Sequence, residues 1–177
     1  MASADTPRAK PFDDRGRPRY LLTFYTNRRA HVFVALDVVT LVYEQIRRAA
    51  LENGFAIVAY CFMPDHLHLL IEGTRADADR LRFVYRAKQY AGAHHARAFG
   101  GRRLWQRHSY ERALGDHDDL RAIAGQVISN PIRAGLARRV EDYPFVGSDV
   151  YVIRGGSDAR LTPGGTGQPG SSASHCP

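Results

Sequence analysis

Cysteine is scarce in this chain, and long apolar runs are absent. Only Cys61 and Cys176 occur among 177 residues, which excludes a disulfide-built scaffold and a zinc site with four cysteine ligands. So few cysteines fit a reducing compartment, and we expect a cytoplasmic protein. No stretch reaches about 18 apolar residues, and residues 1–17 lack the apolar core of a signal peptide. We therefore expect neither a membrane span nor a secretion signal.

Acidic residues are outnumbered by basic ones. Asp and Glu total 18 against 25 Lys and Arg, which gives a net charge of +7. With 44% hydrophobic and 24% charged residues, the composition is that of a folded globular domain. The basic excess favours a polyanionic partner such as nucleic acid, although a folded domain with a charged surface explains it equally well.

Both ends of the chain have the composition of unfolded segments. Residues 1–18 mix charges with proline and glycine and show no periodicity, and residues 155–177 consist mainly of Gly, Pro and Ser. Such segments bury too little apolar surface to offset their ordering entropy. We predict a flexible segment at 1–18, one folded domain at 19–154 and a disordered tail at 155–177.

The folded part mixes strand and helix patterns. Apolar or β-branched runs predict strands at 20–26, 55–62 and 66–72, with a further strand candidate at 102–110. Apolar spacings of three and four predict helices at 36–53, 77–99 and 116–129, and a short helical turn at 132–138. Asp37 caps the first helix in this prediction, and Asp116 or Asp118 caps the third, which Pro131 ends or kinks.

The middle of the domain is predicted to be a hairpin, because the turn Met63-Pro64-Asp65 separates two adjacent strands. A hairpin argues against an all-parallel sheet. The order β-α-β-β-α-(β)-α predicts an α+β domain with a ferredoxin-like split βαβ antiparallel sheet and helices on one face.

The sharpest local pattern is His66-Leu67-His68. Residues i and i+2 of a strand share a face, so both imidazoles project together while Leu67 enters the core. Two neutral imidazoles side by side make half of a divalent metal site. A polar strand face with two solvated histidines is the alternative interpretation of the same spacing.

A second pattern joins Gln126 and Asn130, which lie four residues apart and share one helix face. The side-chain oxygen of Asn130 suits Mg²⁺ or Mn²⁺. Alternatively, Asn130-Pro131 only closes the helix.

A third pattern is basic and aromatic. Guanidinium groups pair with phosphates and aromatic rings stack on unpaired bases, although an amphipathic strand with Leu104 and Trp105 in the core explains the pattern equally well. We predict a DNA-binding surface with Lys88 on the exposed side of the preceding helix and Arg133 after the last one. Its members are Lys88, Arg102, Arg103, Trp105, Gln106, Arg107 and Arg133.

Taken in order, three segments resemble the IS200-like Y1 transposases and their REP-associated tyrosine transposase branch. Residues 62–70 resemble the HUH motif (His, hydrophobic, His), and residues 104–114 resemble the segment that follows it. Residues 130–136, NPIRAGL, resemble the NPVRAGL signature of that branch. The resemblance spans roughly residues 20–144.

The resemblance implies an HUH endonuclease fold and metal-dependent nicking and rejoining of single-stranded or hairpin DNA. His66, His68 and Asn130 would hold the divalent metal, Mg²⁺ or Mn²⁺, which acts as a Lewis acid on the phosphate. A tyrosine on the last helix would form the covalent 5′-phosphotyrosine. Related proteins occur as monomers and as homodimers.

The sequence departs from the family at the nucleophile. The family tyrosine stands four residues before the NP asparagine, where this chain has Gln126. Tyr85 and Tyr90 lie on the preceding helix, and Tyr110 matches an aromatic position of the family. Three hypotheses follow: a DNA-processing enzyme with another nucleophile, a catalytically inactive protein that binds hairpin DNA, or a phosphoesterase in which Gln126 orients water.

Overall fold

The computed structural model describes residues 17–154 and 160–163. They form a five-stranded sheet in the order β4-β1-β3-β2-β5 and a two-stranded sheet of β6 and β7. The strands are β1 (Arg19–Thr26), β2 (Phe55–Met63), β3 (His66–Gly73), β4 (Trp105–Leu114), β5 (Val146–Gly147), β6 (Tyr151–Arg154) and β7 (Arg160–Pro163). The helices are α1 (Leu36–Glu52), α2 (Arg80–Ala98), α3 (Leu120–Ile128) and α4 (Asn130–Arg133), with 3₁₀ turns η1 (Asn27–Arg29) and η2 (Val140–Asp142).

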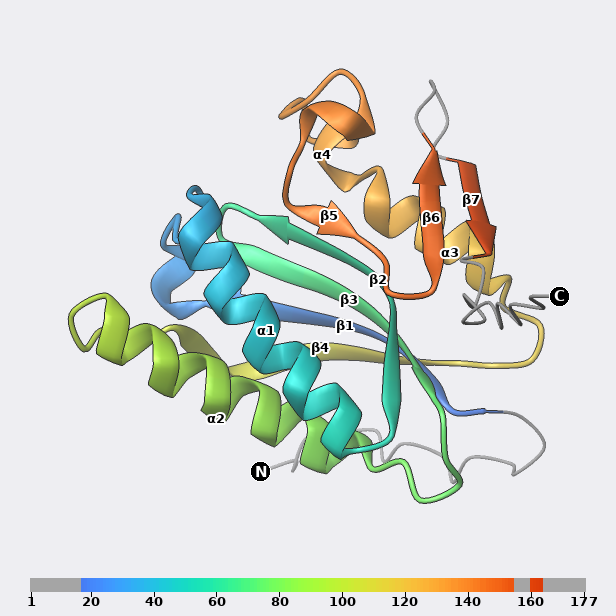
Figure 1. The fold of residues 1–177 in the computed structure, drawn as a ribbon, viewed down its shortest axis with the longest axis horizontal. Coiled ribbons are helices and arrows are strands. Elements are labelled where there is room, and N and C mark those ends of the chain that lie inside the picture. The colour runs from blue at the N-terminus through green and yellow to red at the C-terminus, as the bar shows by residue number, and fades with distance from the viewer. Residues whose placement is uncertain (1–16, 155–159, 164–177) are drawn as a thin grey trace, which may run out of the picture.

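The chain order β1-α1-β2-β3-α2-β4 confirms the predicted α+β, ferredoxin-like architecture (Figure 1). Every pairing in the large sheet is antiparallel. β2 and β3 form the predicted hairpin, and β1 pairs with β3 on one side and with β4 on the other. β3 therefore lies inside the sheet, between the strand that precedes α1 and the strand that follows it.

Helices cover both faces of the sheet. α1 and α2 lie side by side on one face (Figure 1). Ile46, Phe83 and Leu69 belong to the buried cluster on this face. α3 packs on the opposite face, where Val127 joins a second cluster with Leu70. The prediction of helices on one face is therefore correct for α1 and α2 and wrong for α3. β2 and β3 are apolar on both faces, so both faces require cover.

A bulge in β2 changes which of its side chains face each cluster. The pairing of β2 with β3 shifts register between Ile57 and Ala59, which leaves Val58 as an extra residue. Ile57 belongs to the α1 and α2 cluster, whereas Val58 and Ala59 belong to the α3 cluster. The bulge therefore reverses the alternation along β2: Phe55 and Ile57 face the α1 and α2 cluster before it, whereas Ala59 and Cys61 face the α3 cluster after it.

Helix ends differ from the prediction in several places. Asp119, rather than Asp116 or Asp118, caps α3 by accepting from the amides of Arg121 and Ala122. Asp37 lies inside α1, whose cap residue makes no side-chain bond. Pro131 kinks the chain and α4 resumes at once, since proline suits the first turn of a helix.

The predicted ends of the domain are only partly described. β7 falls within the predicted tail and pairs with β6, which precedes the tail. The rest of residues 155–177 and residues 1–16 lie outside the described part. Within residues 17–154 and 160–163, no helix has the length and apolarity needed to cross a membrane.

Replacing Ile46 by alanine tests the packing of α1. Ile46 has no exposed surface, so Ile46→Ala removes buried methyl groups and leaves a cavity. We expect a loss of about 2–5 kcal/mol in the free energy of unfolding, measured by urea denaturation. Leu51→Ala on the same helix is the control, because Leu51 is 64% exposed. Equal losses in the two variants would contradict the packing described.

Candidate functional site

His66 and His68 lie on the α3 face of β3. The alternation of the strand turns Leu67 and Leu69 into the α1 and α2 cluster and leaves both imidazoles beside Leu70 on the other face. Both rings are partly buried, and the His66 side chain is 17% exposed. The histidines therefore share one face, as the sequence predicts, and neither ring is freely solvated.

The two imidazoles converge through their outer nitrogens. His66 Nε2 and His68 Nε2 lie 3.1 Å apart, and each Nδ1 has its own partner. His66 Nδ1 donates to Asp65 Oδ1 at 2.6 Å, since a carboxylate only accepts. His68 Nδ1 lies 3.0 Å from the Thr23 hydroxyl, which either donates or accepts. With Nδ1 as the donor to Asp65, a neutral His66 ring accepts at Nε2, so the 3.1 Å contact is a hydrogen bond donated by His68 Nε2. A cation shared by the two rings would replace the proton of that bond.

The spacing of the two nitrogens fits a shared divalent cation. Imidazole nitrogen binds such ions at about 2.1 Å, so two ligands at a right angle lie about 3.0 Å apart. The observed separation is 3.1 Å. Bonds from Nδ1 to a carboxylate or hydroxyl are the usual way to orient a metal-binding histidine. Asp65 and Thr23 provide such bonds here.

The charge states favour ligation. Burial, with the nearby charges of His66 and Arg133, lowers the pKa of His68 to about 4, so the ring is neutral at physiological pH. A neutral imidazole is the form that binds metal. Burial opposes ionisation of Asp65, but the hydrogen bond to His66 and the charges of His66 and Arg29 outweigh it and lower the pKa of Asp65.

Arg29 continues the network behind His66. Its Nε lies 2.8 Å from Asp65 Oδ2, and its guanidinium lies 4.5 Å from the centroid of the Tyr25 ring. Arg28 and Arg29 adopt φ values of 55° and 56°, the left-handed region that non-glycine residues rarely enter. Such strain concentrates at functional sites. The 3₁₀ turn η1 therefore holds Arg29 against the carboxylate that orients His66.

Sequence reasoning missed Thr23, Tyr25 and Arg29. The pairing of β1 with β3 places Thr23 opposite His68 and Tyr25 opposite His66, so all four side chains share a face. The Tyr25 and His66 ring centroids lie 5.9 Å apart. Only the cross-strand register identifies these neighbours, and the sequence alone does not fix that register.

The segment after α3 lies on the same side of the sheet. The charge of Arg133 acts on His68, and α4 packs on β2. Asn130 begins α4, and its side-chain amide donates to the Val127 carbonyl at 3.2 Å, so Oδ1 remains available as a ligand atom. Gln126 is exposed on α3, one turn earlier.

Other metal-ligating side chains do not complete the site. Within the described residues, no group of three or more His, Cys, Asp and Glu gathers around one point. Glu72 shares the histidine face but accepts a bond from Arg19 at 2.9 Å. Cys61 lies opposite His68, but burial raises the pKa of its thiol to about 12 and keeps it protonated. A cation held by the two histidines would therefore take any third protein ligand from another residue type, such as Asn130.

The basic and aromatic segment is only partly exposed. Trp105 is 4% exposed in the α1 and α2 cluster with Leu104, so its predicted stacking on DNA bases is wrong. Lys88 points inward, with Nζ 3.2–3.3 Å from three β4 carbonyls, and burial, with the charge of Arg103, lowers its pKa to about 8. Lys88 is therefore half-buried rather than fully exposed, and it lines the groove between α2 and the segment 101–107. Arg102, Arg103, Arg107 and Arg133 are exposed, and Gln106 is half-buried.

Comparison with known proteins establishes the family. The model of the family described as "Transposase IS200 like" matches residues 17–115, more than half of the chain. The chain therefore belongs to the IS200-like transposase family. The match ends before α3, so Gln126 and Asn130 lie beyond it.

Individual relatives agree with this assignment. A REP-associated tyrosine transposase of Haemophilus influenzae is 30% identical over 101 residues, which cover 51% of this chain and 57% of that protein. Its counterpart in Escherichia coli K12 is 28% identical over 126 residues, covering 67% and 72% of the two chains. A solved REP-associated tyrosine transposase bound to a REP hairpin shares the fold, with a TM-score of 0.64 and 21% identity over 80% of this chain and 82% of that one.

Replacing Thr23 by valine tests the orientation of His68. Thr23→Val keeps the shape of the side chain and removes the hydroxyl bonded to Nδ1. We expect about a 10- to 100-fold loss of Mn²⁺ affinity in calorimetric titrations. Thr40→Val, on the exposed side of α1, is the control and should bind Mn²⁺ with wild-type affinity. Wild-type affinity in Thr23→Val would mean that Thr23 does not orient a metal ligand.

Proposed function

We propose that this chain binds hairpin DNA with a single-stranded flank and holds Mg²⁺ or Mn²⁺ between His66 and His68. The observation that carries the proposal is the 3.1 Å approach of the two Nε2 atoms beside the exposed Arg133. Membership of the transposase family supports a DNA partner. A relative of the same fold was solved on a REP hairpin, which supports the hairpin form of the substrate.

The residues around the histidine pair have distinct roles in this proposal. His66, His68 and Asn130 hold the cation, which when bound polarises a phosphate oxygen as a Lewis acid. Asp65 and Thr23 hold the imidazoles in the orientation that ligation requires. Arg133, on the exposed side of α4, binds a DNA phosphate through its guanidinium.

The residue at position 126 decides between cutting and binding. An amide does not attack phosphorus to form a stable ester, so Gln126 cannot form the phosphotyrosine of the family. Gln126 is also exposed on α3. We therefore propose that the chain, with its metal, binds hairpin DNA and forms no covalent link through position 126.

One specific observation favours a second candidate, strand cleavage by Tyr25. Tyr25 lies opposite His66, and their ring centroids are 5.9 Å apart. In this reaction the Tyr25 oxygen bonds to phosphorus as the bond from phosphorus to the 3′ oxygen breaks. The phenol proton leaves to solvent, and the departing 3′ oxygen gains a proton. Tyr90 is unsuited, because its hydroxyl donates to Glu52 on the α1 and α2 side of the sheet.

Incubation with labelled hairpin oligonucleotides and Mn²⁺ separates the two candidates. We expect a retarded complex on a native gel and no covalent adduct on a denaturing gel. An adduct that persists in Tyr110→Phe and disappears in Tyr25→Phe would instead establish cleavage by Tyr25. Tyr110 is the matched control because it faces the same side of the sheet, two strands from His68. Cut DNA without an adduct would indicate hydrolysis by water.

Restoring the family nucleophile tests the role of position 126. Gln126→Tyr places a phenol on the exposed side of α3, one turn before Asn130. We expect Mn²⁺-dependent covalent capture of the oligonucleotide, seen as a band of combined mass on a denaturing gel. The double variant Gln126→Tyr with His66→Ala should lose that band. A Gln126→Tyr variant that binds metal and hairpin but forms no adduct would contradict this account of position 126.

A further inference from the structure

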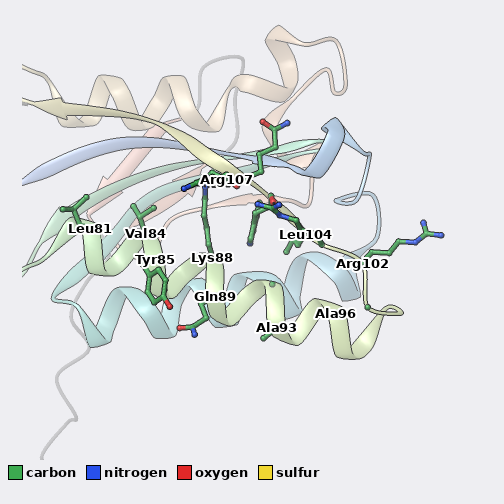
Figure 2. Close-up of a pocket in the computed structure, with 15 residues that line it drawn as sticks. Leu81, Val84, Tyr85, Lys88, Gln89, Ala93, Ala96, Arg102, Leu104 and Arg107 are labelled. Atoms are coloured by element: carbon green, nitrogen blue, oxygen red, sulfur yellow. Dashed lines mark hydrogen bonds between the residues drawn. The ribbon is translucent and has the colours of Figure 1, made fainter. Parts of the chain in front are cut away.

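A groove of about 660 Å³ lies between the outer side of α2 and the segment 101–107 (Figure 2). Leu81, Val84 and Tyr85 line it from α2, and the chain from Gly101 to Arg107 forms the opposite wall. Leu81 is 68% exposed and Tyr85 is 63% exposed, although both side chains are large and largely apolar. An aromatic ring and a leucine held in water at one groove indicate a binding surface.

The groove is basic and free of acidic side chains. Residues 80–110 include eight Lys and Arg but no Asp or Glu. Arg80 forms an ion pair with Glu111, and Lys88 Nζ lies within hydrogen-bond distance of three main-chain carbonyls, and both side chains are half-buried. Arg102, Arg103 and Arg107 are exposed and form no ion pair within the described part of the chain. The lining therefore complements a ligand with both flat apolar groups and negative charges.

An added peptide strand fits this groove poorly. β4 is an edge strand, and an extended peptide would bind it by pairing with its free main-chain groups. Lys88 Nζ already lies within hydrogen-bond distance of the carbonyls of Gln106, Arg107 and His108. The part of β4 that borders the groove therefore offers few acceptors to a peptide.

We propose that this groove binds unpaired nucleotides of the DNA, with a base stacked on Tyr85 and phosphates held by Arg102 and Arg107. The proposal rests on the proposed DNA-binding function. It places the single-stranded part of the DNA in this groove, away from the histidine pair. Aromatic rings stack on any unpaired base, and guanidinium groups follow the backbone phosphates. Tyr85 thus takes the stacking role that the sequence pattern assigned to the buried Trp105.

The groove and the histidine pair occupy different sides of the sheet. α2 packs on the face with Leu67 and Leu69, whereas His66 and His68 share the face of α3. β4 is the edge strand between these two regions. A DNA molecule that reaches both the groove and the histidine pair passes around β4, where Arg107 is exposed. Changes in the groove should therefore leave Mn²⁺ binding unaltered.

Fluorescence anisotropy with two probes tests the groove, namely a blunt hairpin and the same hairpin with a six-nucleotide single-stranded flank. We expect Tyr85→Ala to weaken binding of the flanked probe about 5- to 100-fold and to leave the blunt probe unchanged. Tyr85→Phe should restore binding, because the aromatic ring remains. Arg102→Ala with Arg107→Ala should lower the slope of log affinity against log salt by about 1.4 for the flanked probe. Arg47 is exposed on α1, and Arg47→Ala is the matched control. It should leave the affinity for both probes unchanged.

The outcomes separate the groove from the proposed function. If the wild type binds both probes and the groove variants bind the flanked probe equally well, the groove assignment is wrong and hairpin binding stands. If the wild type binds neither probe, the proposed function fails and the groove assignment fails with it. If a poly-glutamate peptide binds the wild type, loses affinity in Tyr85→Ala and is not displaced by single-stranded DNA, the groove is a peptide site.

Discussion

The antiparallel register of β3 with β1 is the constraint on which the site depends. It places Thr23 opposite His68 and Tyr25 opposite His66, and a shift of β3 by one residue would turn both histidines to the other face. The same alternation buries Leu67 and Leu69 completely. Hydrophobic burial on one face therefore fixes the convergence of the two imidazole nitrogens on the other.

Apolar burial on both faces of β2 and β3 brings the rest of the site into place. The bulge at Val58 turns Ala59 and Cys61 toward the histidine face, and α3 covers them with Val127 and Ile128. The chain then kinks at Pro131, so that α4 carries Arg133 close enough for its charge to act on His68. The helix that buries this second core thus also brings positions 126–133 to the histidine side of the sheet.

Periodicity and turn chemistry were sufficient to predict β1, β2, β3 and part of β4, the hairpin and the shared face of His66 and His68, but not the short strands β5, β6 and β7. They were insufficient for Lys88 and Trp105, because a basic or aromatic residue in a mixed segment packs inward or outward according to tertiary contacts that the sequence does not specify. The same holds for α3, whose apolar side is visible in the sequence, whereas the face of the sheet that it covers is not. Thr23, Tyr25 and Arg29 became identifiable only from cross-strand register and the left-handed turn.

The central claim is that His66 and His68 together hold a divalent cation although Gln126 replaces the nucleophile. Calorimetric titration of Mn²⁺ into the full chain and into His66→Ala and His68→Ala tests it most directly. The account predicts one site per chain in the wild type and loss of that site in either variant, with the fold retained by circular dichroism. Unchanged Mn²⁺ affinity in both folded variants would contradict it.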